Sequence, residues 1–326
     1  MNPFQIRSGR VAPSAIIFIA LSLNFFAAAS DEAFPESITI GYQKLSALNS
    51  LQKHKHLDER LAPLGVKVKW VSFPAGPQLL EALSVNSAVF GETGDAPPIF
   101  AQASGAPIVY TAYHPARPKS NGILVSKTSP IKSLSDLRGK KVAVTQGSSA
   151  HWLLSKALES AGLNFTDITP IYLSAPDTLT ALASGRVDAC ATWEPFKTLL
   201  QRKIGARLIA DGSGLIASYG FYLARRDFAE RHPRLLQIIK EELAKADADI
   251  IKNLNSFVED NAKEVGLPAE ILLSLLQDAT PGVLDLSPEV VASQQEIPDR
   301  FFQMGLIQKQ ISVQENVFNP NEENRK

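Results

Sequence analysis

The chain has 326 residues, of which 45% are hydrophobic and 20% are charged. This composition is typical of a folded globular protein with about two domains. The 33 basic residues balance the 33 acidic ones, so there is no strongly basic surface for nucleic acid and we expect no such partner.

The first residues have the order of a secretory signal peptide. Arg7 and Arg10 precede an apolar stretch, residues 11–26, which ends in Ala27-Ala28-Ala29. A membrane anchor is the alternative, but proline, serine and asparagine side chains interrupt the apolar stretch. We therefore predict that residues 1–29 are a signal peptide, that cleavage follows Ala29, and that the protein is exported.

The middle of the chain contains an internal repeat. "FPAGPQLLEAL" (73–83) and "YLSAPDTLTAL" (172–182) align without gaps. The same offset continues into "GETGD" (91–95) and "CATWE" (190–194), where Thr93 corresponds to Thr192 and Asp95 to Glu194. Several short matches in the same order indicate two copies of one structural unit.

In chain order, each copy predicts alternating strands and helices. The first copy has strands at 38–41, 66–73 and 88–91, a helix at 45–64 and a second helix that begins with proline. The second copy has strands at 141–144, 168–173 and 187–191 and a helix at 150–161. A fourth strand closes each copy. This alternation predicts mainly parallel sheets covered by helices, an α/β fold.

The repeat predicts two similar lobes, residues 36–117 and 118–220. Residues 221–318 contain the main helical periodicity after them, at 233–253, 262–279 and 287–305, and we expect them to pack back on the first lobe. The polar tail, 319–326, is predicted to be disordered. The only cysteine, Cys190, lies in an apolar run and is predicted to be a buried structural thiol.

The carboxyl ends of the strands predict one ligand cleft between the lobes. Ligands of open α/β sheets bind at these ends, where this chain has hydroxyls, amides and several helix starts. Unpaired N–H groups and the positive end of the helix dipole favour anions there. Lys44 is the only Lys or Arg at the predicted strand ends. The pattern indicates a small anion with an apolar tail, held by neutral donors.

Catalytic and metal sites are the alternatives. Ser148 and His151 are close enough for a nucleophile and base, but G-x-S-x-G is absent, and we favour helix capping plus ligand contact. Asp95 and Glu194 are interpreted as helix caps rather than as an acid–base pair. The H-x-H pair His54 and His56 is interpreted as part of a solvated face rather than a metal site.

Seven segments resemble the periplasmic aliphatic sulfonate-binding proteins of ATP-binding-cassette importers, over residues 36–318. The most specific are "FPAGPQLLEAL" (73–83) and "TGDAPPIFAQASG" (93–105), and the others are "GYQK" (41–44), "SPIKSLSDLRGKKVAV" (129–144), "GSSAHWLL" (147–154), "LNFTDITPIYL" (163–173) and "GFYLARR" (220–226). The resemblance implies a two-lobed type II periplasmic binding fold, with mixed sheets, a hinge and a central ligand cleft. Lobe one then comprises 36–117 plus 221–318, and lobe two comprises 118–220.

The resemblance also implies the function and the ligand residues. The expected function is capture of alkanesulfonates for sulfur supply, by a monomer that delivers them to an inner-membrane permease and its ATPase. No cofactor, metal or catalysis is expected. The sulfonate is expected at Thr93 and Ser148-Ser149, with Trp193 and Phe221 beside the carbon tail, although Trp193 equally fits an ordinary core. The full set of positions is Gln43, Thr93, Gly94, Gly147, Ser148, Ser149, His151, Trp193 and Phe221.

Two other classes stay open at this point. One is a binding protein for another small anion, such as taurine, nitrate or an aromatic sulfonate. The other is an enzyme on the same fold, such as a pyrimidine-forming or dehydratase relative. The pyrimidine-forming family has a cysteine-rich motif, which this chain lacks.

Overall fold

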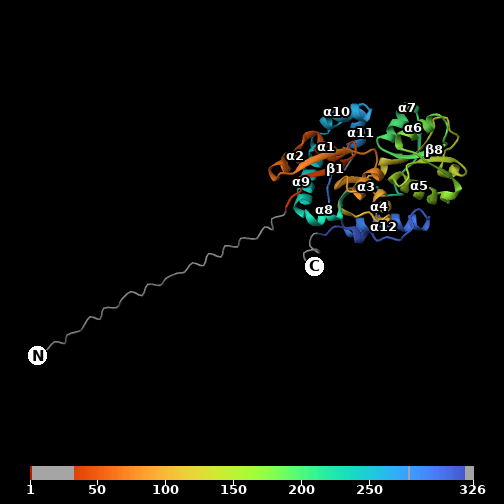
Figure 1. Ribbon diagram of the computed structural model, residues 1–326. Coiled ribbons are helices and arrows are strands. Elements are labelled where there is room, and N and C mark those ends of the chain that lie inside the picture. The colour runs from red at the N-terminus through yellow and green to blue at the C-terminus, as the bar shows by residue number, and fades with distance from the viewer. Residues whose placement is uncertain (2–32, 278–279, 320–326) are drawn as a thin grey trace. The chain divides into compact units, whose positions relative to one another are not determined.

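The computed structural model describes the whole chain except residues 2–32, 278–279 and 320–326. The predicted signal peptide after Met1 and the tail after Asn319 therefore lie outside the described residues. The rest of the chain, from Phe34 onward, forms one compact unit. This unit contains two five-stranded sheets with helices packed around them (Figure 1). The predicted α/β class is confirmed.

The first sheet is mixed, with one antiparallel strand among four parallel ones. The inserted strand is β10 (Gly220–Arg225), which runs antiparallel to both of its neighbours, β3 and β4. In spatial order the sheet consists of β2 (Lys67–Ser72), β1 (Ser37–Tyr42), β3 (Phe90–Gly94), β10 and β4 (Ile108–His114).

The second sheet repeats this order with its own inserted strand. Strand β5 (Asn121–Val125) runs antiparallel between β8 and β9. In spatial order the sheet consists of β7 (Thr169–Tyr172), β6 (Lys141–Val144), β8 (Ala189–Trp193), β5 and β9 (Arg207–Asp211). The prediction of mainly parallel sheets is thus modified by one crossing strand in each, as the family resemblance implies.

The chain passes between the two sheets twice, through the crossing strands β5 and β10. The chain leaves the first sheet after β4, enters the second as β5, completes that sheet, and returns to the first as β10. The two crossings are joined by hydrogen bonds: Arg117 N–H donates to Ser218 O, and Asn121 Nδ2 donates to Ser218 Oγ at 2.7 Å. Short connections of this kind are where hinge residues are found, because a few loop residues can absorb the change in φ and ψ.

Most helices of the two repeats begin where the repeat predicts. A proline lies in the first turn of α3 and of α6, where its missing N–H costs nothing. The first repeat contains α1 (Ala47–His54), α2 (His56–Leu61), α3 (Gly76–Ser84) and α4 (Pro97–Ala103). The second contains α5 (Ser149–Ser160), α6 (Ala175–Ala183) and α7 (Phe196–Ile204).

Two predicted helices are each broken in the structure. The predicted helix at 45–64 is interrupted at Lys55, whose φ of 58° lies in the left-handed region and ends α1. The predicted helix at 262–279 is also wrong, because Gly266 ends one helix with a φ of 77° and Pro268 precedes the next. The Gly–Leu–Pro sequence at 266–268 was the stop signal that the apolar periodicity concealed.

The C-terminal helices contact the first sheet and a helix of the second repeat. Helix α9 packs on the first sheet with α1, whereas α12 contributes Gln294 to the first sheet and Phe301 to the second-sheet helix α5. These helices are α8 (Arg226–Arg231), α9 (Pro233–Lys252), α10 (Leu254–Val265), α11 (Ala269–Leu276) and α12 (Pro288–Gln303). Among the residues that the structure describes, no helix is long and apolar enough to cross a membrane.

Prediction for the fold: shortening a buried side chain of the crossing strand β5 destabilises the protein. All five residues of β5 are buried, and Val125 is 0% exposed. Val125→Ala should lower the free energy of unfolding by about 2 kcal/mol, since it removes buried methyl groups and leaves a cavity. The matched control is Val85→Ala, at a side chain that is 67% exposed. Urea unfolding measures both, and equal stability of the two variants contradicts the assigned core.

Candidate functional site

Three helix starts and the end of one strand meet at Thr93 and Gly94. A Cβ atom built on Gly76, the first residue of α3, would lie 1.9 Å from Thr93 Oγ1 and 2.7 Å from Pro97 at the start of α4. A Cβ built on Gly94 would lie 2.2 Å from Ser149 Oγ, at the start of α5. Glycine at these two positions therefore permits both close approaches.

Thr93 has an unused hydroxyl in this place. The residue is 2% exposed, and its Oγ1 has no hydrogen-bond partner among the described protein atoms. No side chain caps the start of α3. A buried hydroxyl beside an uncapped helix start is suited to an anion, which accepts hydrogen bonds from both.

Ser148 and Ser149 have different surroundings. Ser148 Oγ donates to Thr145 O at 2.7 Å and accepts the His151 N–H at 3.3 Å, so it caps α5 and its one proton is already used. Ser149 is partly buried and its hydroxyl is hydrogen-bonded to the Asp95 side chain. Of the two predicted serines, Ser149 is the one that faces the other sheet.

Gly147 lies in the loop before α5 and sets the backbone conformation there. Its φ of 73° is in the left-handed region, and a Cβ atom there would lie 3.3 Å from the Phe100 ring. Both facts favour glycine. Its N–H donates to His151 Nδ1 at 3.3 Å.

His151 lies in an aromatic cluster rather than beside a nucleophile. The ring is 0% exposed and packs against four other rings, and burial lowers its pKa to about 4. Its partners are Phe100, Phe165, Tyr172 and Phe301. Because Ser148 Oγ donates to a backbone carbonyl, no Ser148–His151 side-chain hydrogen bond exists in the described structure. The geometry does not support the Ser–His nucleophile alternative.

The remaining predicted residues lie at three places. Gln43 Nε2 donates to Glu92 O at 2.9 Å and joins the end of β1 to β3. Phe221 is the register partner of Thr93 and is 0% exposed, packed edge-on against Tyr110. Trp193 is partly buried at the end of β8, edge-on to Phe196. Phe221 thus supports Thr93 from the core, while Trp193 belongs to the second sheet.

Asp95 and Glu194, the two predicted helix caps, differ in whether a cation lies beside the carboxylate. Asp95 Oδ1 accepts the Ala96 N–H at 2.9 Å before α4, and Glu194 Oε2 accepts the Thr198 N–H at 3.2 Å in α7. Glu194 also pairs with Lys197 at 2.9 Å. Burial raises the pKa of Asp95 to about 6, although hydrogen bonds from Ser149 and Ala96 act in the opposite direction.

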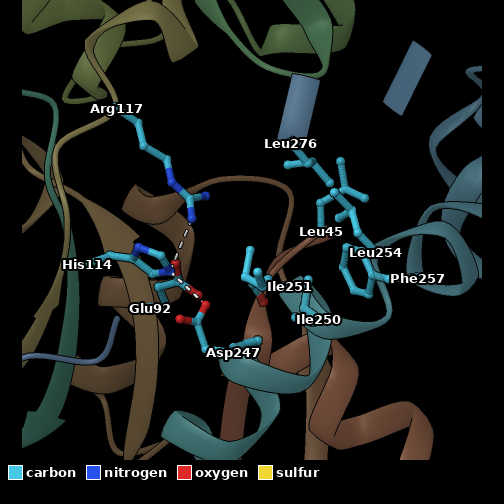
Figure 2. Close-up of a pocket in the computed structure, with 12 residues that line it drawn as sticks. Leu45, Glu92, His114, Arg117, Asp247, Ile250, Ile251, Leu254, Phe257 and Leu276 are labelled. Atoms are coloured by element: carbon cyan, nitrogen blue, oxygen red, sulfur yellow. Dashed lines mark hydrogen bonds and ion pairs between the residues drawn. The ribbon is translucent and has the colours of Figure 1, made fainter. Parts of the chain in front are cut away.

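The structure contains a polar cluster, close to where the chain leaves the first sheet, that the sequence did not predict. His114 Nε2 lies 3.2 Å from Asp247 Oδ1 and 3.4 Å from Arg117 Nη2, and Glu92 lines the same pocket. Figure 2 shows these four side chains facing an apolar wall formed by Leu45, Ile250, Ile251, Leu254, Phe257 and Leu276. Arg117 lies three residues after β4, beyond the predicted strand end at Tyr113-His114, and adds a cation to this pocket.

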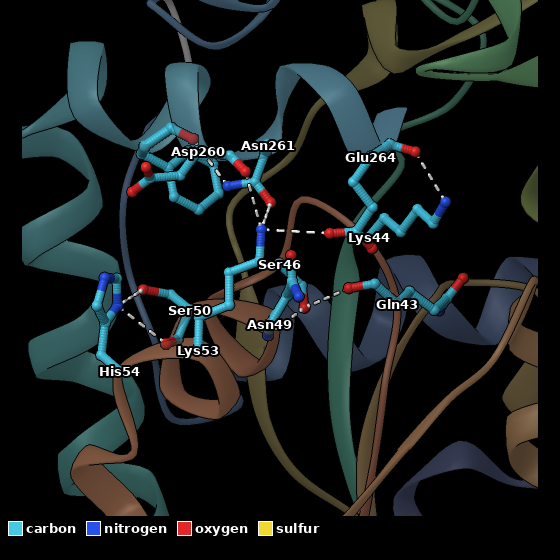
Figure 3. A network of polar contacts seen from close by, with 11 residues as sticks. Gln43, Lys44, Ser46, Asn49, Ser50, Lys53, His54, Asp260, Asn261 and Glu264 are labelled. Atoms are coloured by element: carbon cyan, nitrogen blue, oxygen red, sulfur yellow. Dashed lines mark hydrogen bonds and ion pairs between the residues drawn. The ribbon is translucent and has the colours of Figure 1, made fainter. Parts of the chain in front are cut away.

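Lys44 itself is bonded to the C-terminal helices. Its Nζ donates to Glu264 O at 2.9 Å, and Lys53 Nζ donates to Asn261 Oδ1 at 2.7 Å (Figure 3). In the same network, His54 Nδ1 lies 3.1 Å from Ser50 O. Its neighbour His56 stacks on it, with ring centroids 5.6 Å apart. No group of three or more metal-ligating side chains is found in the described part of the chain.

The buried thiol prediction is confirmed. Cys190 is 0% exposed in β8, and burial raises its pKa to about 12, so it has no reactive thiolate near neutral pH.

Comparison with known proteins places this geometry in a family. The family model described as "NMT1/THI5 like" matches residues 63–253. An aliphatic sulfonates-binding protein of Escherichia coli (strain K12) is 42% identical over 301 residues, which cover 92% of this chain and 94% of that protein. The chain belongs to the aliphatic sulfonate-binding family.

Two solved members of this family share the fold. The alkanesulfonate-binding protein SsuA from Xanthomonas axonopodis pv. citri, bound to MOPS, is 38% identical with a TM-score of 0.83, covering 88% of this chain and 99% of that chain. The periplasmic aliphatic sulphonate binding protein SsuA from E. coli is 41% identical with a TM-score of 0.79, covering 88% and 93%. The predicted two-lobed periplasmic binding fold is confirmed, and these relatives are named as binding proteins.

Prediction for the site: His151 makes stability depend on pH. Its folded-state pKa of about 4 lies below the ordinary value of 6.5. Between about pH 4 and pH 6.5, His151 is therefore protonated in the unfolded chain but neutral in the folded protein. The stabilisation is complete above pH 6.5 and is lost as the pH falls towards 4, about 3 kcal/mol in all.

The test compares the wild type with His151→Phe, which keeps an aromatic ring but cannot titrate. The free energy of unfolding should fall more steeply in the wild type between pH 6.5 and 4.5. His56→Gln, at an exposed position, is the control and should follow the wild type. Parallel curves for wild type and His151→Phe contradict the buried neutral imidazole.

Proposed function

We propose that this protein is a solute-binding protein that captures aliphatic sulfonates for import by an ATP-binding-cassette transporter. The supporting observation is the contact of Ser149, at the start of α5, with Gly94 at the end of β3. It brings a hydroxyl and a helix start from the second sheet against Thr93 of the first. A sulfonate has three acceptor oxygens, and this set of neutral donors complements them.

The lobes and the hinge follow from the same arrangement. We propose that residues 36–117 with 221–318 form one lobe and that residues 118–220 form the other. The ligand lies between them, and the connections on either side of Arg117 and Ser218 are the hinge. Closure then completes the donor set, because Thr93 and Ser149 belong to different lobes.

The cellular setting is part of the proposal. The protein is exported by a signal peptide comprising residues 1–29 and acts in the periplasm as a monomer. There it delivers its ligand to a permease and its ATPase at the inner membrane. Capture requires no chemical step, which agrees with a serine that caps a helix and a histidine held neutral in an aromatic cluster.

Prediction for ligand contact: Ser149 matters for affinity and Ser148 for stability. Ser149→Ala should raise the Kd for ethanesulfonate about five- to 150-fold, since a charged acceptor loses a desolvated donor worth about 1–3 kcal/mol. Ser148→Ala should lower stability by about 1 kcal/mol through loss of the cap, with a smaller change in affinity. Calorimetric titration and thermal unfolding measure the two effects.

The control is Ser184→Ala, an exposed serine at the end of α6. Acetate and nitrate serve as competing anions and should bind more weakly than the sulfonate. Unchanged ethanesulfonate affinity in folded Ser149→Ala contradicts the assigned site. If the wild type converts the ligand into a product, the protein is an enzyme and the proposed binding function is wrong.

Prediction for closure: Gly94→Ala prevents full closure. The added Cβ would lie 2.2 Å from Ser149 Oγ but 3.4 Å from Ser149 Cβ. The radius of gyration with saturating ethanesulfonate should therefore be larger for Gly94→Ala than for the wild type. The double variant Gly94→Ala, Ser149→Ala should regain the compact form. Small-angle scattering measures this, and identical wild-type profiles with and without ligand contradict closure.

A further inference from the structure

Asp95 is a buried acid next to the proposed sulfonate position. The residue is 2% exposed and lies between the end of β3 and the start of α4. Its Oδ1 accepts the backbone N–H of Ala96 at 2.9 Å, and the Ser149 hydroxyl is a side-chain donor to the carboxyl group. Gln294 of α12 donates to its backbone carbonyl at 2.6 Å.

No described cation balances this carboxylate. The packed elements present Ser149 from α5, Gln294 from α12 and Tyr110 from β4. Tyr110 is the only titratable group among them, and it is neutral because burial raises its pKa far above neutral pH. By contrast, Glu194 at the equivalent position of the second repeat pairs with Lys197 at 2.9 Å. Burial accordingly raises the pKa of Asp95 to about 6.

A sulfonate bound at Ser149 creates a conflict with ionised Asp95. Two anions then approach the same hydroxyl in a desolvated place with no cation between them. Ser149 has only one hydroxyl proton, and the ionised carboxylate accepts it. If Asp95 is protonated, its O–H donates to Ser149 Oγ, and the serine proton is free to bond a sulfonate oxygen. One proton on Asp95 removes the repulsion and supplies the missing donor.

We propose that sulfonate binding is coupled to the uptake of one proton from solvent by Asp95, which makes Asp95 the residue that sets affinity as a function of pH. This proposal rests on the proposed function. No covalent bond forms or breaks apart from the Asp95 O–H bond. The chemistry selects ligands that keep their charge at low pH, and sulfonates do so.

The experiment is calorimetric titration of ethanesulfonate between pH 6 and 8.5. The buffers are bis-Tris propane and imidazole, which differ in ionisation enthalpy and contain no sulfonate. The wild-type Kd should rise towards about tenfold for each pH unit above about 6. The heat difference between the buffers should approach one proton taken up per ligand near pH 8. A Kd that is independent of pH, with no proton taken up, overturns the proposal.

Three variants assign the proton to its residue. Asp95→Asn should bind at pH 8 as tightly as the wild type does at low pH, with no proton uptake. Glu194→Gln is the matched control and should keep the wild-type pH dependence. Glu92→Gln tests the other acid near the strand end, where His114 and Arg117 already face the carboxylate. Loss of the pH dependence in Glu92→Gln alone contradicts the assignment to Asp95.

The outcomes separate this proposal from the function beneath it. Tight binding without proton uptake leaves the sulfonate function intact and overturns the role of Asp95. Failure of the wild type to bind ethanesulfonate at every pH overturns both. The proton count uses the wild-type protein, so it decides the matter even if Asp95→Asn does not fold.

Discussion

The absence of a side chain at Gly94 is the constraint on which the site depends. Ser149 Oγ lies 2.2 Å from where a Cβ atom of residue 94 would be, and this close contact brings the start of α5 against the end of β3. Gly76 gives Thr93 the same close approach to α3. Two glycines thus bring donors from both sheets together, where larger residues would hold them apart. The two sheets are connected by two short segments, one that leads into β5 and one that leads into β10.

Several charged side chains near the cleft pair with other groups, whereas no described cation pairs with Asp95. Lys44 and Lys53 bond to α10, and Glu194 pairs with Lys197. Arg117 lies in the pocket with His114, close to two carboxylates. The donors that remain are hydroxyls and helix starts, which bind an anion without the desolvation cost of a buried ion pair. In the proposed site, selectivity rests on the geometry of these donors and on the protonation state of Asp95.

The sequence predicts the parts that depend on local pattern. Apolar runs and the repeat located the strands, and Lys141–Val144 forms β6 at its predicted bounds. Glycine and proline signals located the starts of α3 and α6. The two broken helices were missed because apolar periodicity continues through Lys55 and Gly266, where single backbone conformations end the helices.

Long-range contacts could not be predicted in this way. The ring that packs on His151 from α12 is Phe301, 150 positions away along the chain. Arg117 and Asp247 meet only because α9 returns to the first sheet. Likewise, the sequence places Ser148 and Ser149 at a helix start but does not indicate which hydroxyl is already used. That distinction depends on Thr145 O and Asp95, which the fold supplies.

A crystal structure of the protein with ethanesulfonate tests the central claim most directly. The account predicts sulfonate oxygens within about 3.2 Å of Ser149 Oγ and Thr93 Oγ1, at the starts of α5 and α3. A sulfonate paired instead with Arg117 in the pocket beside His114 and Asp247, with Thr93 Oγ1 still without a partner, would contradict it.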